Sequence, residues 1–307
     1  MSDKEAAPGS AKSGASGPDA GNKREGPGNK PVPRAKQKPA AAGGPQGQGR
    51  HSLRVNERIV FLHIAKCAGS SLAVLLASNF PENEVFHRRD DVLGTLNSDT
   101  LRSYRFFHGH FTKHSVDAVP GPKRIVTVLR DPRERIVSLY HFWRSHKPEV
   151  VERLNLRGPR IARQRPLLEF LKSKEPEVTV SIDNHMVRVM LGSLNLNQSQ
   201  GFRLQDRDYA VETAITNLKR FNYVAFADTL DEDVRMMMPI LGLAGADGLP
   251  RLNTFETLDA NRNFEKIARE ESTDEVRAEL DRLTVSDRLF YRRARDIRHT
   301  LRCPYPS

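Results

Sequence analysis

The sequence predicts an α/β fold around a mainly parallel sheet flanked by helices, and three observations support this prediction. Apolar runs at 58–64 and 124–129 are each followed directly by a segment with helical spacing of apolar residues. The run Arg124–Leu129 is apolar almost throughout, as expected for a strand covered on both faces. Strand-like and helical segments keep alternating beyond it, which is typical of strands joined through helices.

The first strand, Arg58–Ile64, leads through a short loop into a helix over about 70–80, whose leucines fall on one face. A short strand, Tyr104–Phe107, ends at a His-Gly-His segment. After the strand 124–129, Asp131 suits a helix N-cap, with proline next and glutamate three residues on, so a helix is expected to about His146.

Residues 147–165 are basic and contain Gly158 and two prolines, so they predict a loop or insertion over the surface. Their arginines could recruit an acidic polysaccharide or form an ordinary solvated face, and both interpretations stay open. The remaining expected elements are a strand at Tyr223–Ala227 and helices over about 166–173, 181–191, 208–220, 230–241, 273–282 and 285–298.

Composition divides the chain into a tail, residues 1–54, and one domain, residues 55–307. The first fifty residues contain ten glycines and seven prolines but no aromatic residue, and such a stretch cannot bury a core, so we expect disorder. The tail has ten Lys/Arg against four Asp/Glu, which leaves about +5 of the total charge of +11 for the domain. A solvated linker is the preferred interpretation, although peripheral contact with a membrane stays open.

The composition also limits location and partners. There is no run of eighteen apolar residues and no secretion signal, so neither a transmembrane helix nor export is expected. The two cysteines, Cys67 and Cys303, give no disulfide framework, and a cytoplasmic location is expected. Basic and aromatic residues are not interleaved in the domain, so no nucleic acid partner is expected. The oligomeric state is not readable from the sequence.

The segment Arg58–Leu76, RIVFLHIAKCAGSSLAVLL, predicts an oxyanion site. A strand leads into a loop that opens a helix, which presents backbone N–H groups and a positive helix end, and Lys66 adds a charge. It is not a Walker A loop, because the lysine precedes the glycine. Cys67 could be a thiolate nucleophile, but no base is adjacent in sequence, so packing within the loop is favoured.

Two further segments carry chemistry. In Val128–Arg144, Arg130 follows a strand and Ser138 lies eight residues on, so both could hold a second phosphate. The alternative is that Arg130 pairs with Asp131 or Glu134 and only fixes the helix. The His108-Gly109-His110 segment could bind a metal, fill a structural role or supply a general base, and the metal interpretation is the weakest because no carboxylate or cysteine is nearby.

Together the three segments resemble the sulfotransferase family 2, whose best-known members modify heparan and chondroitin chains. Its loop H-I-P-K-T-A-G-T-S-L is similar to His63–Leu72, HIAKCAGSSL, and its motif R-D-P-x-E-R-x-x-S matches Arg130–Ser138 at every fixed position. The His-Gly-His segment is similar to that of the heparan sulfate 2-O-sulfotransferases. DNHMVRVMLG at 183–192 and DRLFYRRA at 287–294 look like late family segments, so the resemblance covers about 57–297.

The resemblance implies a P-loop-like three-layer fold and an enzyme dependent on 3′-phosphoadenosine 5′-phosphosulfate (PAPS), in class EC 2.8.2.-, without a metal. A carbohydrate hydroxyl is the implied acceptor. His110 is the implied base, with His108 as the other candidate, and Lys66 is implied in catalysis. The implied nucleotide contacts are Lys66, Cys67, Ala68, Gly69, Ser70, Ser71, Arg130 and Ser138.

Two departures and two alternatives accompany the resemblance. Ala65 replaces the usual proline and Cys67 the usual threonine, which removes one hydroxyl from the loop. No membrane anchor is expected, so soluble bacterial relatives of the family are a closer comparison than the animal Golgi enzymes. A nucleotide-dependent kinase of the P-loop type is disfavoured by the missing G-K-[ST]. An inactive glycan-binding relative is disfavoured because all three segments persist.

Overall fold

The computed structural model describes residues 53–54, 56–88, 91–192, 204–245, 249 and 263–302. The expected tail lies outside these residues except for Leu53 and Arg54, as does Cys303. The division into a tail over 1–54 and a domain over 55–307 therefore stays a prediction.

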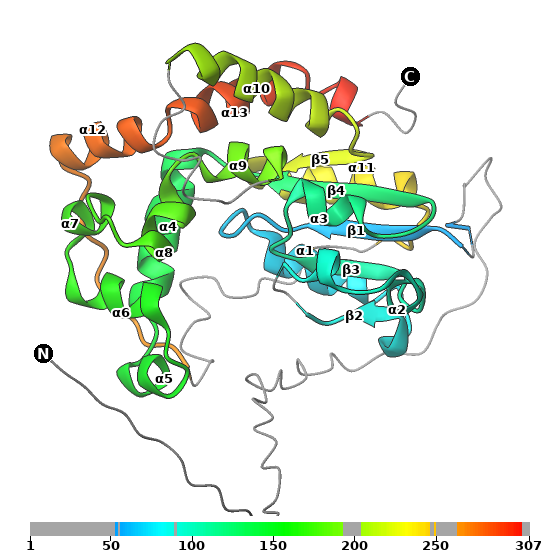
Figure 1. Cartoon of the computed structure of the whole chain (residues 1–307), viewed down its shortest axis with the longest axis horizontal. Helices are drawn as coiled ribbons and strands as arrows, with labels where there is room; N and C mark the ends of the chain where they lie inside the picture. The colour runs from blue at the N-terminus through cyan, green and yellow to red at the C-terminus, as the bar shows by residue number, and fades with distance from the viewer. Residues whose placement is uncertain are drawn as a thin grey trace, which may run out of the picture. The chain divides into compact units, whose positions relative to one another are not determined.

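The described residues form a parallel sheet of five strands in the order β2-β3-β1-β4-β5, which confirms the predicted fold class (Figure 1). The strands are β1 (Arg58–Leu62), β2 (Val85–Phe86), β3 (Phe106–Gly109), β4 (Lys123–Leu129) and β5 (Tyr223–Phe226). β2 was not predicted, because two residues are too short to show a pattern. β3 begins two residues later than predicted and includes Gly109, since it is set by pairing with β1.

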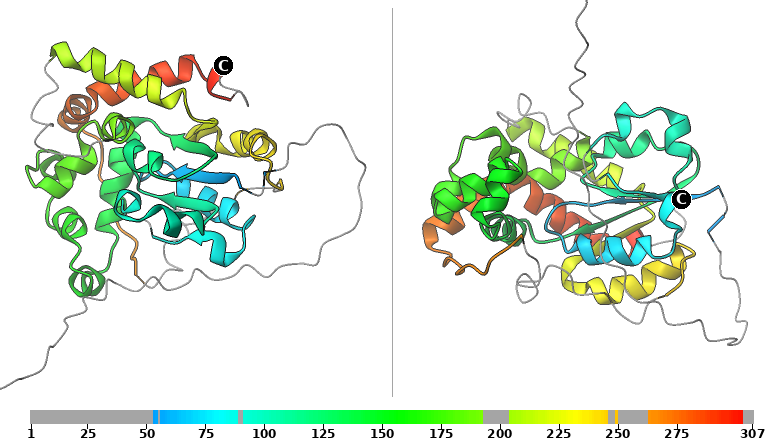
Figure 2. Two further views of the ribbon diagram at one scale, coloured as in Figure 1. Left: turned by 45° about the vertical axis from the view of Figure 1, so that its right-hand side comes forward. Right: turned by 90° about the horizontal axis from the view of Figure 1, so that it is seen from below.

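Helices cover both faces of the sheet, with α1 and α11 on one face and α10 on the other (Figure 2). Ile59, Val60, Phe61 and Leu62 of β1 are fully buried, as expected for the central strand of a doubly covered sheet. The helices are α1 (Gly69–Ala77), α2 (Ser98–Arg102), α3 (Lys113–Asp117), α4 (Pro132–Arg144), α5 (Pro148–Arg153), α6 (Arg157–Gln164), α7 (Leu167–Leu171), α8 (Pro176–Ile182), α9 (His185–Leu191), α10 (Leu204–Leu218), α11 (Leu230–Ile240), α12 (Asp274–Leu283) and α13 (Val285–Asp296). None of the helices in the described ranges is long and apolar enough to cross a membrane.

The prediction of a loop over 147–165 is wrong, because this stretch forms α5 and α6. Val150, Val151 and Ala162 are buried, so the two helices have an apolar side that the basic composition masked. Gly158 is required by packing: a Cβ there would lie 2.7 Å from the Trp143 ring of α4. Tertiary burial therefore decides the structure of this segment against its local composition.

Two arginines of this stretch already form hydrogen bonds or ion pairs within the protein. Arg163 donates to the carbonyls of Arg144 and His146 and pairs with Glu265 at 2.6 Å. Arg165 donates to the Ser173 hydroxyl at 2.9 Å. A role of this region in recruiting polysaccharide thus stays a hypothesis, with fewer available charges than the sequence suggested.

The predicted helix over 181–191 is two helices, α8 and α9, separated at Asn184. Asn184 has a left-handed backbone with φ of 45°, which ends one helix and starts the next in a new direction. Asparagine tolerates this conformation better than most residues. The change of direction makes a wall of residues 181–185, which is referred to below as the α8–α9 wall.

The α8–α9 wall is locked to α13 by two reciprocal helix caps. The Asn184 side-chain oxygen accepts from the N–H groups of Ser286 and Asp287, at 2.8 and 3.1 Å. In return, the Asp287 carboxylate accepts from the N–H groups of Met186 and Val187, at 3.1 and 2.8 Å. Each side chain satisfies buried N–H groups that have no intrahelical partner at the start of the other helix.

Replacing Asn184 by glycine should destabilise the protein by about 1–3 kcal/mol, because the left-handed backbone is kept while the buried N–H groups of Ser286 and Asp287 lose their acceptor. Chemical denaturation would measure the change in the free energy of unfolding. Asn155→Gly is a matched control, since Asn155 also has a positive φ of 48° but is exposed. Equal effects of the two substitutions would show that the cap contributes nothing.

Candidate active site

The carboxyl ends of β1, β3 and β4 meet at one edge of the sheet and open into a cavity of about 1490 Å³. Leu62 of β1 is in register with Gly109 of β3 and Thr127 of β4, so the segments that follow all emerge together. In Figure 1, α4 stands at the end of the sheet where the loop after β1 emerges. Ligands of parallel α/β sheets bind at such an edge.

The loop between β1 and α1 is tightly shaped by its backbone. Lys66 and Ala68 have left-handed conformations, with φ of 67° and 61°, which are costly for residues other than glycine. Gly69 begins α1 against the ring of His63, where a Cβ would lie 2.4 Å from the nearest ring atom. Glycine therefore lets the helix approach His63 closely, and the first turn of α1 faces the cavity.

Lys66 carries the charge of this loop in a partly desolvated place. Its Nζ lies 3.9 Å from the centre of the Phe142 ring, a cation–π distance. Burial, together with the neighbouring charge of Arg130, lowers the pKa of Lys66 to about 8. An anion in the cavity would stabilise the protonated amine, because it would offset both the desolvation and the repulsion.

Arg130 connects the loop to α4. Its Nε and Nη2 donate to Glu134 at 3.2 and 3.1 Å, and its Nη1 is 3.5 Å from the Lys66 carbonyl oxygen. The pairing with Glu134, which was the alternative interpretation of Arg130, is therefore present. The pair is partly exposed, however, since 65 % of the Glu134 side-chain surface is accessible to solvent. Ion pairs at such exposed positions contribute little to the free energy of folding. A bound phosphate could compete for this guanidinium.

The N-terminus of α4 is built as predicted. The Asp131 carboxylate accepts from the N–H groups of Arg133 and Glu134, at 3.0 and 3.2 Å, and Pro132 occupies the first turn. The helical spacing then places Ser138 on the cavity side, one turn beyond Glu134. Ile136 and Tyr140 are buried on the opposite side of α4, in a second apolar cluster.

His110 is exposed in the cavity, and its tautomer is set by the backbone. Its Nδ1–H donates to the carbonyl of His63 at 2.9 Å, which leaves the lone pair of the neutral imidazole on Nε2. Its ring centre lies 4.9 Å from that of His63. His108 is buried, stacks on Phe106 at 5.4 Å and does not line the cavity.

The cavity gathers most of the side chains that the sequence singled out. Those that line it are Lys66, Ala68, Gly69, Ser70, Ser71, His110, Arg130 and Ser138. Cys67 is fully buried instead, and burial raises the pKa of its thiol to about 12. Its N–H donates to the carbonyl of Ile64 at 3.3 Å. Cys67 thus packs within the loop, and its thiol has neither the exposure nor the charge of a nucleophile.

Two cavity residues lie in segments that the sequence singled out, but neither was assigned a role from it. His185 of α9 donates Nδ1–H to the carbonyl of Val180 at 2.9 Å, and burial lowers its pKa to about 3, so it is held neutral. Arg135 of α4 is fully buried and donates to the Ser181 carbonyl at 2.7 Å, while its Nε and Nη1 have no partner among the described residues. Local spacing shows neither residue, because both face the cavity only after α9 has packed beside α4.

A third unpredicted contribution is the segment 263–272, which borders the cavity next to α4. Its backbone bonds to the end of α4: the N–H of Glu265 donates to Ser145 at 2.8 Å, and the N–H of Lys147 donates to Asn263 at 3.1 Å. Glu270 accepts from Tyr140 and Arg144, and from the N–H of Leu167 at 2.7 Å. The segment has no helical or strand periodicity, so its place beside the cavity could not be predicted from the sequence.

The charge of the cavity is positive. Six of the described residues that line it are cationic and three are acidic. The cations are Lys66, Arg130, Arg133, Arg135, Arg269 and Arg277, and the acids are Glu134, Asp231 and Glu270. In the part of the chain that is described, no three His, Cys, Asp or Glu side chains gather as a metal ion would need. The lining therefore suits an anionic ligand.

Comparison with known families adds to this geometry. Residues 48–197, just under half of the chain, match the sulfotransferase domain family. No curated protein matches the chain significantly. The matched span contains the loop after β1, His110 and the segment Arg130–Ser138, which are the parts that meet in the cavity. The match supports a sulfotransferase domain over these residues.

Proposed function

We propose that this protein transfers a sulfuryl group from PAPS to a hydroxyl group of a carbohydrate. The sulfotransferase domain match supports sulfuryl transfer in general, and enzymes of this kind generally use PAPS as donor. The membership of family 2 and the nature of the acceptor rest on the resemblance of the three site segments. The expected cytoplasmic location also stays a prediction.

The observation that carries the proposal is that one cavity contains two cationic positions, on two different elements, and an imidazole whose Nδ1–H is held by the backbone. Lys66 and the first turn of α1 form one position, and Arg130 with Ser138 forms the other. PAPS has the matching chemistry, since it has a phosphosulfate at one end and a 3′-phosphate elsewhere. His110 lines the same cavity.

In this proposal each side chain has one task. His110 Nε2 accepts the proton of the acceptor hydroxyl as its oxygen attacks sulfur. The bond from sulfur to the bridging oxygen breaks, and 3′-phosphoadenosine 5′-phosphate (PAP) leaves. Lys66 and the N–H groups of α1 offset the charge on the moving group and on the leaving phosphate. Arg130 and Ser138 hold the 3′-phosphate, and the alignment of the reactants supplies much of the rate.

Isothermal titration calorimetry with PAP and with ATP tests the proposed donor. The expected result is a clear preference for PAP, because the 3′-phosphate would engage Arg130 and Ser138. Arg130→Ala should remove most of this preference, and an assay of sulfate transfer from radiolabelled PAPS across glycans would then identify the acceptor. Equal affinity for PAP and ATP in the unaltered protein would overturn the proposal and favour a kinase.

His110→Ala should lower kcat by about 10²–10⁴-fold, the usual contribution of a general base, while the affinity for PAP changes less than about twofold. His114→Ala is the control, since His114 is exposed on α3 and lies outside the cavity lining. The rates would be measured as sulfate transfer at saturating PAPS. Unchanged turnover of the His110 variant would remove this residue from the mechanism.

The affinity for PAP should fall as the pH rises above about 8, where Lys66 of the unliganded protein loses its proton. Folding lowers the pKa of Lys66 from 10.5 to about 8, so the charged lysine destabilises the folded protein below pH 8. The free energy of unfolding should therefore rise between about pH 8 and 10.5, as this destabilisation is lost. Binding has the opposite trend, because PAP needs the charged amine, and a roughly tenfold loss is expected between pH 8 and 9.5. In Lys66→Arg, which stays charged, the loss should be absent; the same loss in both proteins would exclude Lys66 as its origin.

A further inference from the structure

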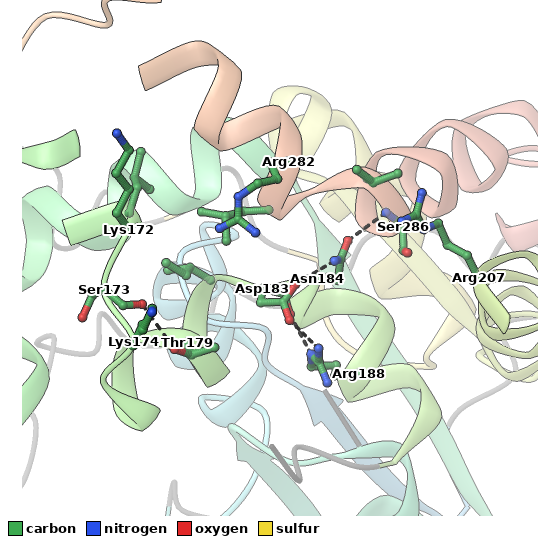
Figure 3. Close-up of a pocket in the computed structure, with 14 residues that line it drawn as sticks. Lys172, Ser173, Lys174, Thr179, Asp183, Asn184, Arg188, Arg207, Arg282 and Ser286 are labelled. Carbon is green, nitrogen blue, oxygen red and sulfur yellow. Dashed lines mark hydrogen bonds and ion pairs between the residues drawn. The ribbon is translucent and has the colours of Figure 1, made fainter. Parts of the chain in front are cut away.

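A second cavity lies behind the α8–α9 wall, with a volume of about 620 Å³ (Figure 3). Ser181 and His185 line the cavity described above, whereas Ile182, Asp183 and Asn184 between them line the second one. The loop after α7, the α8–α9 wall, the start of α10 and the junction of α12 with α13 enclose this space. It is referred to below as the basic cleft.

Three cationic side chains of the basic cleft make no hydrogen bond or ion pair with another described residue, although Lys172 also interacts electrostatically with the exposed carboxylate of Glu275. Lys172 and Lys174 lie on one side of it and Arg207 on the other, with Asp183 and Asn184 between them (Figure 3). The two lysines are exposed, so they can reorient toward a ligand at little cost. Cations on opposite sides of a cleft can contact separate anionic groups of one ligand.

The other charges of the basic cleft are already balanced. Asp183, the one acid among its described lining residues, pairs with Arg188 at 2.5 Å and accepts from the Asn184 amide at 2.8 Å. Arg282 pairs with Glu279 at 2.6 Å. The carboxylate of Asp183 is therefore not available to neutralise the lysines, and the net charge of the space is positive.

The floor of the basic cleft adds a hydrogen-bond donor. Ser286 is 1 % exposed, and its hydroxyl has no partner among the described residues. A buried polar group without a partner costs free energy, and a ligand oxygen that reached the floor would reduce this cost. The cations and the hydroxyl are both suited to oxyanions, which accept hydrogen bonds and carry negative charge.

We infer that the basic cleft is a second anion-binding site for a ligand with at least two sulfate, carboxylate or phosphate groups. It is separate from the cavity lined by Lys66, His110 and Arg130, which is referred to below as the transfer cavity. Lys172 and Lys174 bind one group and Arg207 binds the other. The ligand is either an anionic acceptor that extends past the α8–α9 wall or a separate small polyanion. Anion binding here does not depend on the identity of the sulfuryl donor.

The test compares the full chain with a variant that has Lys172→Ala, Lys174→Ala and Arg207→Ala. The probes are pyrophosphate and a sulfated tetrasaccharide, titrated calorimetrically at low salt and with PAP present. The triple variant should bind at least one probe about tenfold more weakly, and added salt should reduce the difference. Its thermal unfolding and its affinity for PAP should be unchanged, which shows that the fold and the transfer cavity are intact.

The matched control removes three exposed cations elsewhere, with Lys219→Ala, Arg220→Ala and Arg235→Ala. This control variant has the same change in net charge as the triple variant, so its affinity for each probe should be within about twofold of that of the unaltered protein. Equal weakening in both variants, or no weakening in either, would overturn the inference. If the unaltered protein failed to bind PAP but bound a probe through the cleft, the proposed donor would fail while this inference stood.

The two sources of ligand are distinguished by a change in the transfer cavity. Arg277 lines that cavity and not the basic cleft. If Arg277→Ala also lowers the affinity for the tetrasaccharide, the ligand spans both cavities and is an extended acceptor. If only the triple variant of the basic cleft lowers the affinity for the tetrasaccharide, and it lowers the affinity for pyrophosphate as well, the ligand is a separate polyanion.

Discussion

The pairing of β1 with both β3 and β4 is the interaction on which the rest of the structure depends. Because both neighbours are parallel to β1, three loops that are distant in sequence begin at one edge of the sheet. The Thr127 hydroxyl donates to the Leu62 carbonyl at 2.8 Å in the core, and the N–H of His63 donates to Gly109 at 2.9 Å. These bonds fix where the backbone leaves the sheet, and hence where Lys66, His110 and Arg130 meet.

The transfer cavity is electrostatically costly before any ligand binds. Lys66 is desolvated beside Arg130, two residues of the same loop have left-handed backbones, and the buried Arg135 lacks partners for two nitrogens among the described residues. Such features destabilise a folded state, and they persist where the surrounding structure enforces them. Here the fully buried central strand and the packing of Gly69 against His63 provide that enforcement. A preorganised positive cavity is the result, and it needs little rearrangement to receive an anion.

The parts that the sequence predicted have local signals. The strand 124–129 is an apolar run, and α4 begins after an aspartate followed by proline. Arg130 and His110 directly follow strands, and Lys66 lies in the loop after β1. The parts that it missed depend on contacts between distant residues. α6 forms because Gly158 fits against Trp143, Asn184 divides a predicted single helix, and Glu270 reaches the cavity edge through Tyr140 and Arg144. The roles of the individual site residues stay predictions.

The reciprocal caps between Asn184 and α13 have a consequence for the order in which the chain assembles. Asn184 and Ser286 are 102 residues apart, so the start of α9 acquires its partners only after nearly the whole chain has been synthesised. The sheet edge, with its three loops, can form earlier, from contacts that end with β4. The side of the transfer cavity formed by Ser181 and His185 must therefore close late. The span that matches the sulfotransferase family ends at residue 197, so it includes the α8–α9 wall but not α13, to which this wall is capped.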